Sequence, residues 1–162
     1  MKFMAEPGKQ ETTISRILEA KRELAFQAYT DPILIPQWWG PSYLTTTIDK
    51  MVIRPGGMWR FIQHDEVGNE FAFHGVFHTV QPPEKVIYTF EFEGMPGHVM
   101  LEIVTFEDQN DQTMMTDHTV FQSVEDRDEM LSMGMEAGAT ETMDRFADLV
   151  VKVGKILIPV GS

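Results

Sequence analysis

The chain has 162 residues, of which 43% are hydrophobic and 23% charged, and this predicts one domain over residues 1–162 with a core from about residue 11 to residue 152. Thirteen basic and 25 acidic residues give a formal net charge of −12, which argues against nucleic acid as a partner because phosphate binding needs a basic patch. The absence of cysteine excludes disulfides, thiolate catalysis and cysteine-bound zinc.

The first part of the chain predicts one strand followed by two short helices. A β-branched run predicts a strand over 11–18, and helical spacing of apolar residues predicts a helix over 21–30. The Asp-Pro pair at 31–32 favours a second helix start, because Asp can cap a helix and Pro suits its first position. The Gly-Pro pair at 40–41 ends that helix.

The middle of the chain predicts six strands in a meander, separated by turns rich in Gly and Pro. Their expected ranges are 44–53, 58–64, 70–80, 85–93, 98–107 and 113–121. Alternation places Phe71, Phe73, Gly75 and Phe77 on one face of the third of these strands. This assignment of faces predicts that Phe61 points inward and Arg60 points outward. The opposite arrangement would contradict it.

The last part predicts one long amphipathic helix that begins at Ser123, which fits an N-cap. Gly134 and Gly138 each cost about 1 kcal/mol relative to Ala in a helix. Because glycine has no side chain, two glycines four residues apart predict a smooth strip against which another element packs closely. Pro159 would end any helix in the tail. The elements together predict an α+β fold, a curved antiparallel sheet wrapped around the long helix, with the two short helices after the first strand.

Four segments, in this order, resemble the activator of heat-shock protein 90 ATPase homologue family of the START-like, or SRPBCC, superfamily. They are AYTDPILIPQWWGP (28–41), IRPGGMWRF (53–61), HGVFHTVQPPEKVIYTFEFEG (74–94) and SVEDRDEMLSMGMEAGATETMDRFADLV (123–150). The resemblance covers about residues 11–151. It implies the helix-grip (START-like, Bet v-like) fold with a mostly apolar cavity between the sheet and the last helix. It carries no fixed catalytic constellation, and we predict no catalytic residues.

Large side chains on the inward faces are the candidates for a ligand-binding wall. They are Trp38, Trp39, Trp59, Phe61, Phe71, Phe73, Phe77, Tyr88, Phe90, Met115, Asp117 and Met135. Aromatic rings line most small-molecule sites, and an indole N–H can serve as a donor there. Ordinary core packing explains the same residues, because core and pocket wall are contiguous in this fold.

One carboxyl group stands among these apolar candidates. Met115, Asp117 and Thr119 share a strand face, where the family usually has apolar residues. If this face points inward, burial raises the pKa of Asp117 unless a partner compensates. Glu102 on the neighbouring strand would then pair across from it and share a proton. A register shift of one residue instead places both carboxyl groups outside.

The sequence predicts no cofactor and no metal. His74 and His78 share a strand face about 13 Å apart, which is too far for one ion. No apolar run approaches the ~20 residues of a membrane span, and the N-terminus has none of signal length, so a cytoplasmic protein is expected.

Three functions stay open. The favoured one is a non-catalytic module that binds a small apolar molecule in an internal cavity. A cyclase- or hydrolase-like enzyme would use Asp117 or Glu102 as a base. An interaction protein of the stress response, with a chaperone as partner, would need an exposed apolar patch. The chaperone activators of the family carry a further N-terminal domain, for which this chain has no room.

A homodimer is a further expectation, because symmetric dimers are common.

Overall fold

The computed structural model describes residues 1–157, in which eight strands form one antiparallel sheet of order β1-β2-β8-β7-β6-β5-β4-β3. The strands are β1 Lys2–Met4, β2 Glu11–Leu18, β3 Thr45–Met51, β4 Met58–His64, β5 Glu70–Gln81, β6 Lys85–Phe92, β7 Met100–Gln109 and β8 Gln112–Val120. The predicted six-strand meander is confirmed as β3 to β8. The sequence did not predict β1, because three residues are too few to establish an alternation.

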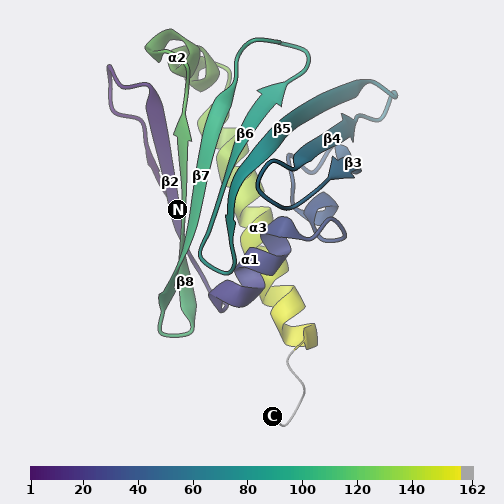
Figure 1. Cartoon of the computed structure of the whole chain (residues 1–162), viewed down its shortest axis with the longest axis vertical. Helices are drawn as coiled ribbons and strands as arrows, with labels where there is room; N and C mark the ends of the chain where they lie inside the picture. Colours follow the sequence, from purple (N-terminus) through teal and green to yellow (C-terminus); the bar gives the residue numbers. More distant parts are fainter. Residues whose placement is uncertain (158–162) are drawn as a thin grey trace.

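The helices gather against one side of this sheet. They are α1 Arg22–Thr30, the 3₁₀ helix η1 Ile35–Gln37, α2 Val124–Ser132 and α3 Met135–Leu157. Figure 1 shows α3 running along the sheet, with α1 beside it and α2 at one end of the strands. A curved sheet around a long C-terminal helix is the helix-grip arrangement that the resemblance implies. Within residues 1–157, no helix is both long and apolar enough to span a membrane.

The predicted second helix after residue 31 is wrong in extent. Only the three residues of η1 adopt a 3₁₀ turn there. Pro36 lacks an N–H donor, and it disfavours the α conformation for Ile35 before it, so an α-helix cannot propagate through this segment.

The single long helix predicted from Ser123 is also wrong, because the structure has two helices there. The cap itself is present, since the Ser123 hydroxyl accepts the backbone N–H of Asp126 at 3.1 Å. Gly134 then adopts a φ of 88°, the left-handed conformation that ends α2 before α3 starts. The prediction about Pro159 lies outside the described residues.

The assignment of strand faces is confirmed at β4. Phe61 is 5% exposed and belongs to the core. Arg60 lies on the opposite face, where its guanidinium binds Glu93 at 2.7 Å and Asp49 at 3.1 Å. The same alternation continues on β5, so the large side chains of the meander face the side of the sheet on which the helices lie.

Gly75 on β5 lets Trp59 of β4 lie flat on the inner face of the sheet. The Trp59 indole N–H donates to the carbonyl of Thr89 at 3.1 Å. A Cβ atom at residue 75 would lie 1.7 Å from that carbonyl oxygen and 2.6 Å from the indole nitrogen. Only glycine therefore fits under this tryptophan.

Candidate functional site

A cavity of about 310 Å³ lies between the inner face of the sheet and the first turns of α3. The sheet contributes Phe73, Tyr88, Phe90 and Met115, and α3 contributes Met135 and Thr142. Gly138 of α3 also lines this space, and apart from its chain neighbours and the nearby backbone of its own helix, no atom lies within 4 Å of where its Cβ would be. The expected close approach of another element at Gly134 and Gly138 is therefore wrong, because Gly138 faces open space and Gly134 ends α2.

The structure gathers most of the sequence candidates around this cavity. Eight of the twelve line it: Trp38, Trp39, Phe73, Tyr88, Phe90, Met115, Asp117 and Met135. Trp59, Phe61 and Phe77 line a neighbouring space of only about 30 Å³. Phe71 lines neither space and lies opposite Gln63 in the β4–β5 register.

The adjacent tryptophans have different surroundings. Trp38 is 4% exposed, stacks on Tyr29 at 5.1 Å between ring centroids, and donates its indole N–H to the carbonyl of Ala28 at 3.0 Å. Trp39 is half-buried and meets Phe73 edge to face at 5.1 Å. Trp38 is thus an anchored core residue, whereas Trp39 presents its ring as part of the cavity wall.

The loop that carries these tryptophans is tied to α3. Arg145 of α3 donates to the carbonyl of Gln37 at 3.0 Å and to the carbonyl of Gly40. Gly40 has a φ of 78°, and a Cβ there would lie 1.9 Å from the side-chain nitrogen of Gln63. The loop therefore requires glycine at this position.

The carboxyl groups of Glu102 and Asp117 both line the cavity. Glu102 is 8% exposed and accepts a hydrogen bond from the Thr119 hydroxyl at 2.9 Å. One carboxyl oxygen of Asp117, Oδ1, is buried and has no hydrogen-bond partner within residues 1–157. The apolar concavity thus contains an acceptor that the surrounding protein leaves unused.

These two carboxyl groups interact from diagonal positions on neighbouring strands, rather than from positions directly opposite each other. The β7–β8 register pairs Glu102 with Thr119 and Asp117 with Val104. Sequence alternation fixes which face a residue is on, but not which residue faces it on the next strand. A diagonal separation still lets two side chains on one face interact.

Burial controls the protonation of this pair. It raises the pKa of Glu102 well above its usual range, and the charge of Asp117 raises it further. Burial also raises the pKa of Asp117, although a hydrogen bond with Glu102 opposes the effect. Two carboxyl groups that interact so closely titrate as one unit, and they hold a shared proton at pH values where separate carboxyl groups would both be ionised.

Two tyrosines lie beside the carboxyl pair. Tyr88 is directly across from Glu102 in the β6–β7 register, and its hydroxyl oxygen is 2.6 Å from that of Tyr29. Burial, followed by the charges of Asp117 and Glu102, raises the pKa of Tyr29 well above its usual range. Burial raises the pKa of Tyr88 in the same direction. Both phenols therefore stay neutral and can donate a hydrogen bond.

Sequence reasoning missed Tyr29, Gln63 and Gly138 as wall residues. Tyr29 follows Ala25 and Ala28 at helical spacing, and this signal could have placed it on the buried face of α1. Gln63 has the same parity as Phe61 on β4, so alternation could have placed it inward.

No lysine, arginine or histidine is among the residues that line the cavity, all of which lie within the described part of the chain. His74 lies on the outer face with Glu91 and Glu93, at 3.2 and 3.0 Å. Across residues 1–157, no group of three or more His, Cys, Asp and Glu side chains could hold a metal ion.

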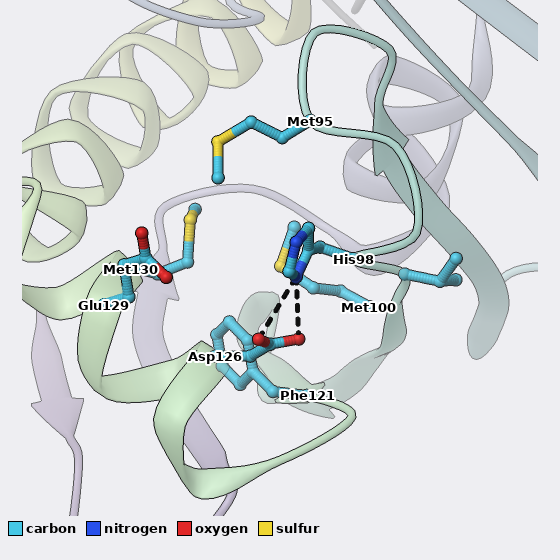
Figure 2. Close-up of a pocket in the computed structure, with 8 residues that line it drawn as sticks. Met95, His98, Met100, Phe121, Asp126, Glu129 and Met130 are labelled. Atoms are coloured by element: carbon cyan, nitrogen blue, oxygen red, sulfur yellow. Dashed lines mark hydrogen bonds and ion pairs between the residues drawn. The ribbon is translucent and has the colours of Figure 1, made fainter.

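A second pocket lies between the β6–β7 loop and α2 (Figure 2). Met95, Met100 and Met130 line it, and the imidazole Nδ1 of His98 lies 3.1 Å from the carboxylate of Asp126. Its volume is only about 30 Å³, the space of a water molecule or two. We interpret these contacts as packing that holds the loop against α2, rather than as a binding site.

A curved antiparallel sheet, a long C-terminal helix across it and a cavity between the two define a START-like, helix-grip protein. Solved structures of the same fold include a protein from Arthrobacter aurescens, with 22% identity, a TM-score of 0.86, and 93% of this chain and 91% of that chain covered. A protein from Mycobacterium smegmatis has 22% identity, a TM-score of 0.82 and coverage of 92% and 95%. A protein from Rhodobacter sphaeroides has 18% identity, a TM-score of 0.84 and coverage of 93% and 99%.

Residues 19–151 match the family described as activator of Hsp90 ATPase homolog 1-like protein, and the chain belongs to this family. This confirms the resemblance inferred from the four sequence segments. Comparison with curated proteins finds no match. At the identities above, the likeness to solved structures establishes the fold alone.

Proposed function

We propose that the protein binds a small, largely apolar molecule in the cavity beneath α3, without transforming it. The observation that carries this proposal is the cavity of about 310 Å³ itself. Ligand sites have volumes from about 300 Å³ upward, with mostly apolar walls and a few convergent polar groups.

Composition of the wall supports this proposal. Aromatic rings and methionines dominate it, and methionine side chains adapt to irregular shapes. The polar groups of the wall include the carboxyl groups of Asp117 and Glu102 and the two tyrosine hydroxyls, as well as Gln63 and Thr142. A guest would lay its apolar body against the rings and direct a polar group to the carboxyl pair.

Gly138 provides the test, because a side chain there projects into open space in the cavity wall. Gly138→Leu should fill the cavity, whereas Gly138→Ala adds one methyl group and serves as the matched control. The probe is N-phenyl-1-naphthylamine, a neutral dye that fluoresces strongly in apolar sites. We expect the wild type and Gly138→Ala to bind it, and Gly138→Leu to bind it at least tenfold more weakly.

Equal dye binding by all three proteins would place the dye elsewhere and contradict the proposal. Native mass spectrometry of the protein purified from its own cells, followed by organic extraction, would identify a natural guest. Circular dichroism of each variant controls for loss of the fold.

A second candidate function is acid–base catalysis, and the inward carboxyl pair with raised pKa values favours it. A carboxylate of this pair would take the α-hydrogen of a bound ketone to give an enolate, and a deuteron from the solvent would then replace that hydrogen. The test is α-hydrogen exchange of 2-tetralone in D₂O, followed by NMR. Exchange that the protein does not accelerate, or that Glu102→Gln and Asp117→Asn leave unchanged, would contradict this candidate.

A further inference from the structure

The geometry points to a guest of one chemical class: a protonated amine joined to an apolar, ring-bearing body, with the ammonium group held between Asp117 and Glu102. This inference rests on the proposed function, since it concerns the same cavity. It adds the charge of the guest and the residues that select it.

The first argument is the imbalance of charge in the wall. Two carboxyl groups line the cavity, and its lining residues include no cationic side chain. A buried carboxylate without a counter-ion is costly, so the empty site keeps a shared proton instead. A guest cation would supply the missing positive charge, whereas a guest carboxylate would add a third acid to the same small space.

The second argument is the unused acceptor. Oδ1 of Asp117 is buried and has no hydrogen-bond partner within residues 1–157. Once the pair has lost the proton of its Asp117–Glu102 hydrogen bond, the donor that Glu102 keeps is the Thr119 hydroxyl. Buried acceptors in native proteins are nearly always satisfied. An ammonium group carries three donors and no acceptor, which matches the acceptors of this carboxyl pair. The side-chain nitrogen of Gln63 in the same wall is also without a partner within residues 1–157, and it would suit an acceptor elsewhere on the guest.

The third argument is the aromatic part of the same cavity wall. Trp39, Tyr88 and Phe90 line the same cavity. The faces of such rings attract cations, most strongly when the site is desolvated, and the rings also pack against an apolar body. The wall therefore suits both halves of an aromatic or alicyclic amine.

Proton release is the signature of this mode of binding. An ammonium ion binds best to the ionised carboxyl pair, so binding should expel the shared proton to solvent. The titratable groups that face the pair are Tyr29 from α1 and Tyr88 from β6, and the residues of α3 in this wall are not titratable. Against the larger effect of burial, the charge of His118 lowers the pKa of Asp117, but the His118 side chain itself pairs with Glu11 at 3.1 Å.

The experiment uses three matched probes on the intact protein: 2-(1-naphthyl)ethylamine, 2-(1-naphthyl)ethanol and 1-naphthylacetate. Isothermal titration calorimetry at pH 7 should give an amine affinity at least tenfold above that of the alcohol, with the acid weakest. Repeating the titration in buffers of different ionisation enthalpy should reveal proton release. Amine affinity should rise with pH from 6 to 8, by at most about tenfold per unit for one released proton.

Two isosteric variants assign the effect to the pair. Asp117→Asn and Glu102→Gln should each reduce the preference for amine over alcohol at least fivefold. Glu107→Gln is the matched control, because Glu107 is exposed and lies on the opposite face of β7. Two separate variants keep the test valid if one of them fails to fold.

The outcomes separate this inference from the proposed function. If the alcohol binds as tightly as the amine, or if neither variant changes the preference, the inference is wrong and the cavity is still a ligand site. If none of the three probes binds and the neutral dye also fails, the proposed function itself is wrong.

Discussion

Replacing Asp117 by leucine should make the protein more stable, although a charged residue is being removed from a strand. The substitution removes a buried oxygen that has no partner within residues 1–157. Leaving such a group unsatisfied costs about 1–3 kcal/mol. The larger leucine side chain has room, because position 117 borders a cavity of about 310 Å³. The expected gain in the free energy of unfolding at pH 8 is therefore about 1–3 kcal/mol.

The pH dependence of this gain follows from the carboxyl pair. Burial raises the folded-state pKa of both acids above their ordinary values of 3.8 for Asp117 and 4.5 for Glu102. The folded protein then holds a proton that the unfolded chain has released, so stability falls as pH rises from these ordinary values toward the raised ones. The leucine variant lacks one acid of the pair, and its advantage should be larger at pH 8 than at pH 5.5.

Urea denaturation of wild type and Asp117→Leu at both pH values measures this difference directly. Asp117→Asn serves as a comparison that removes the charge but keeps a polar group. A leucine variant that is less stable than wild type at pH 8 would refute the reasoning. A gain in stability that does not grow with pH would also refute it, because the carboxyl pair would then not be the source of the destabilisation.

Three further substitutions test the fold around the site. Gly134→Ala should cost about 1–2 kcal/mol of stability, because φ is 88° there and the left-handed region disfavours a Cβ; thermal denaturation with no loss would contradict the assigned break between α2 and α3. Gly75→Ala should cost at least about 1–3 kcal/mol and change tryptophan fluorescence, since its Cβ would lie 1.7 Å from the carbonyl oxygen of Thr89. Arg127→Met should expose residues 1–10 to limited proteolysis, because the buried Arg127 guanidinium donates to the carbonyl of Glu6 at 2.6 Å; an unchanged digestion rate would argue against this anchoring role.

The strands could be predicted from the sequence because alternation has a period of two, and burial of one face enforces it. Phe61 and Arg60 follow this rule, and the inward position of Asp117 follows from the same parity. The break at Gly134 could not be predicted in this way. An isolated glycine costs only about 1 kcal/mol inside a helix, and the apolar spacing continues from α2 into α3 without a gap.

The arrangement of the acidic end depends on contacts between distant segments, so the sequence could not predict it. Register between β7 and β8 decides that Glu102 faces Thr119 rather than Asp117. Tyr29 reaches this end only because α1 packs across the sheet and brings its hydroxyl to Tyr88. Such partners are separated by up to dozens of residues along the chain, beyond the range of any local pattern.

The bond between the hydroxyl groups of Tyr29 and Tyr88 leaves one hydrogen atom unassigned. Two phenols bring two hydroxyl hydrogens, and a single bond between them at 2.6 Å uses one. Either oxygen can be the donor, so the remaining hydrogen can belong to either ring without any movement of the heavier atoms. The cavity therefore has, beside its acceptors, one donor that can reverse its direction, and a guest with a suitably placed oxygen atom would fix which way it points.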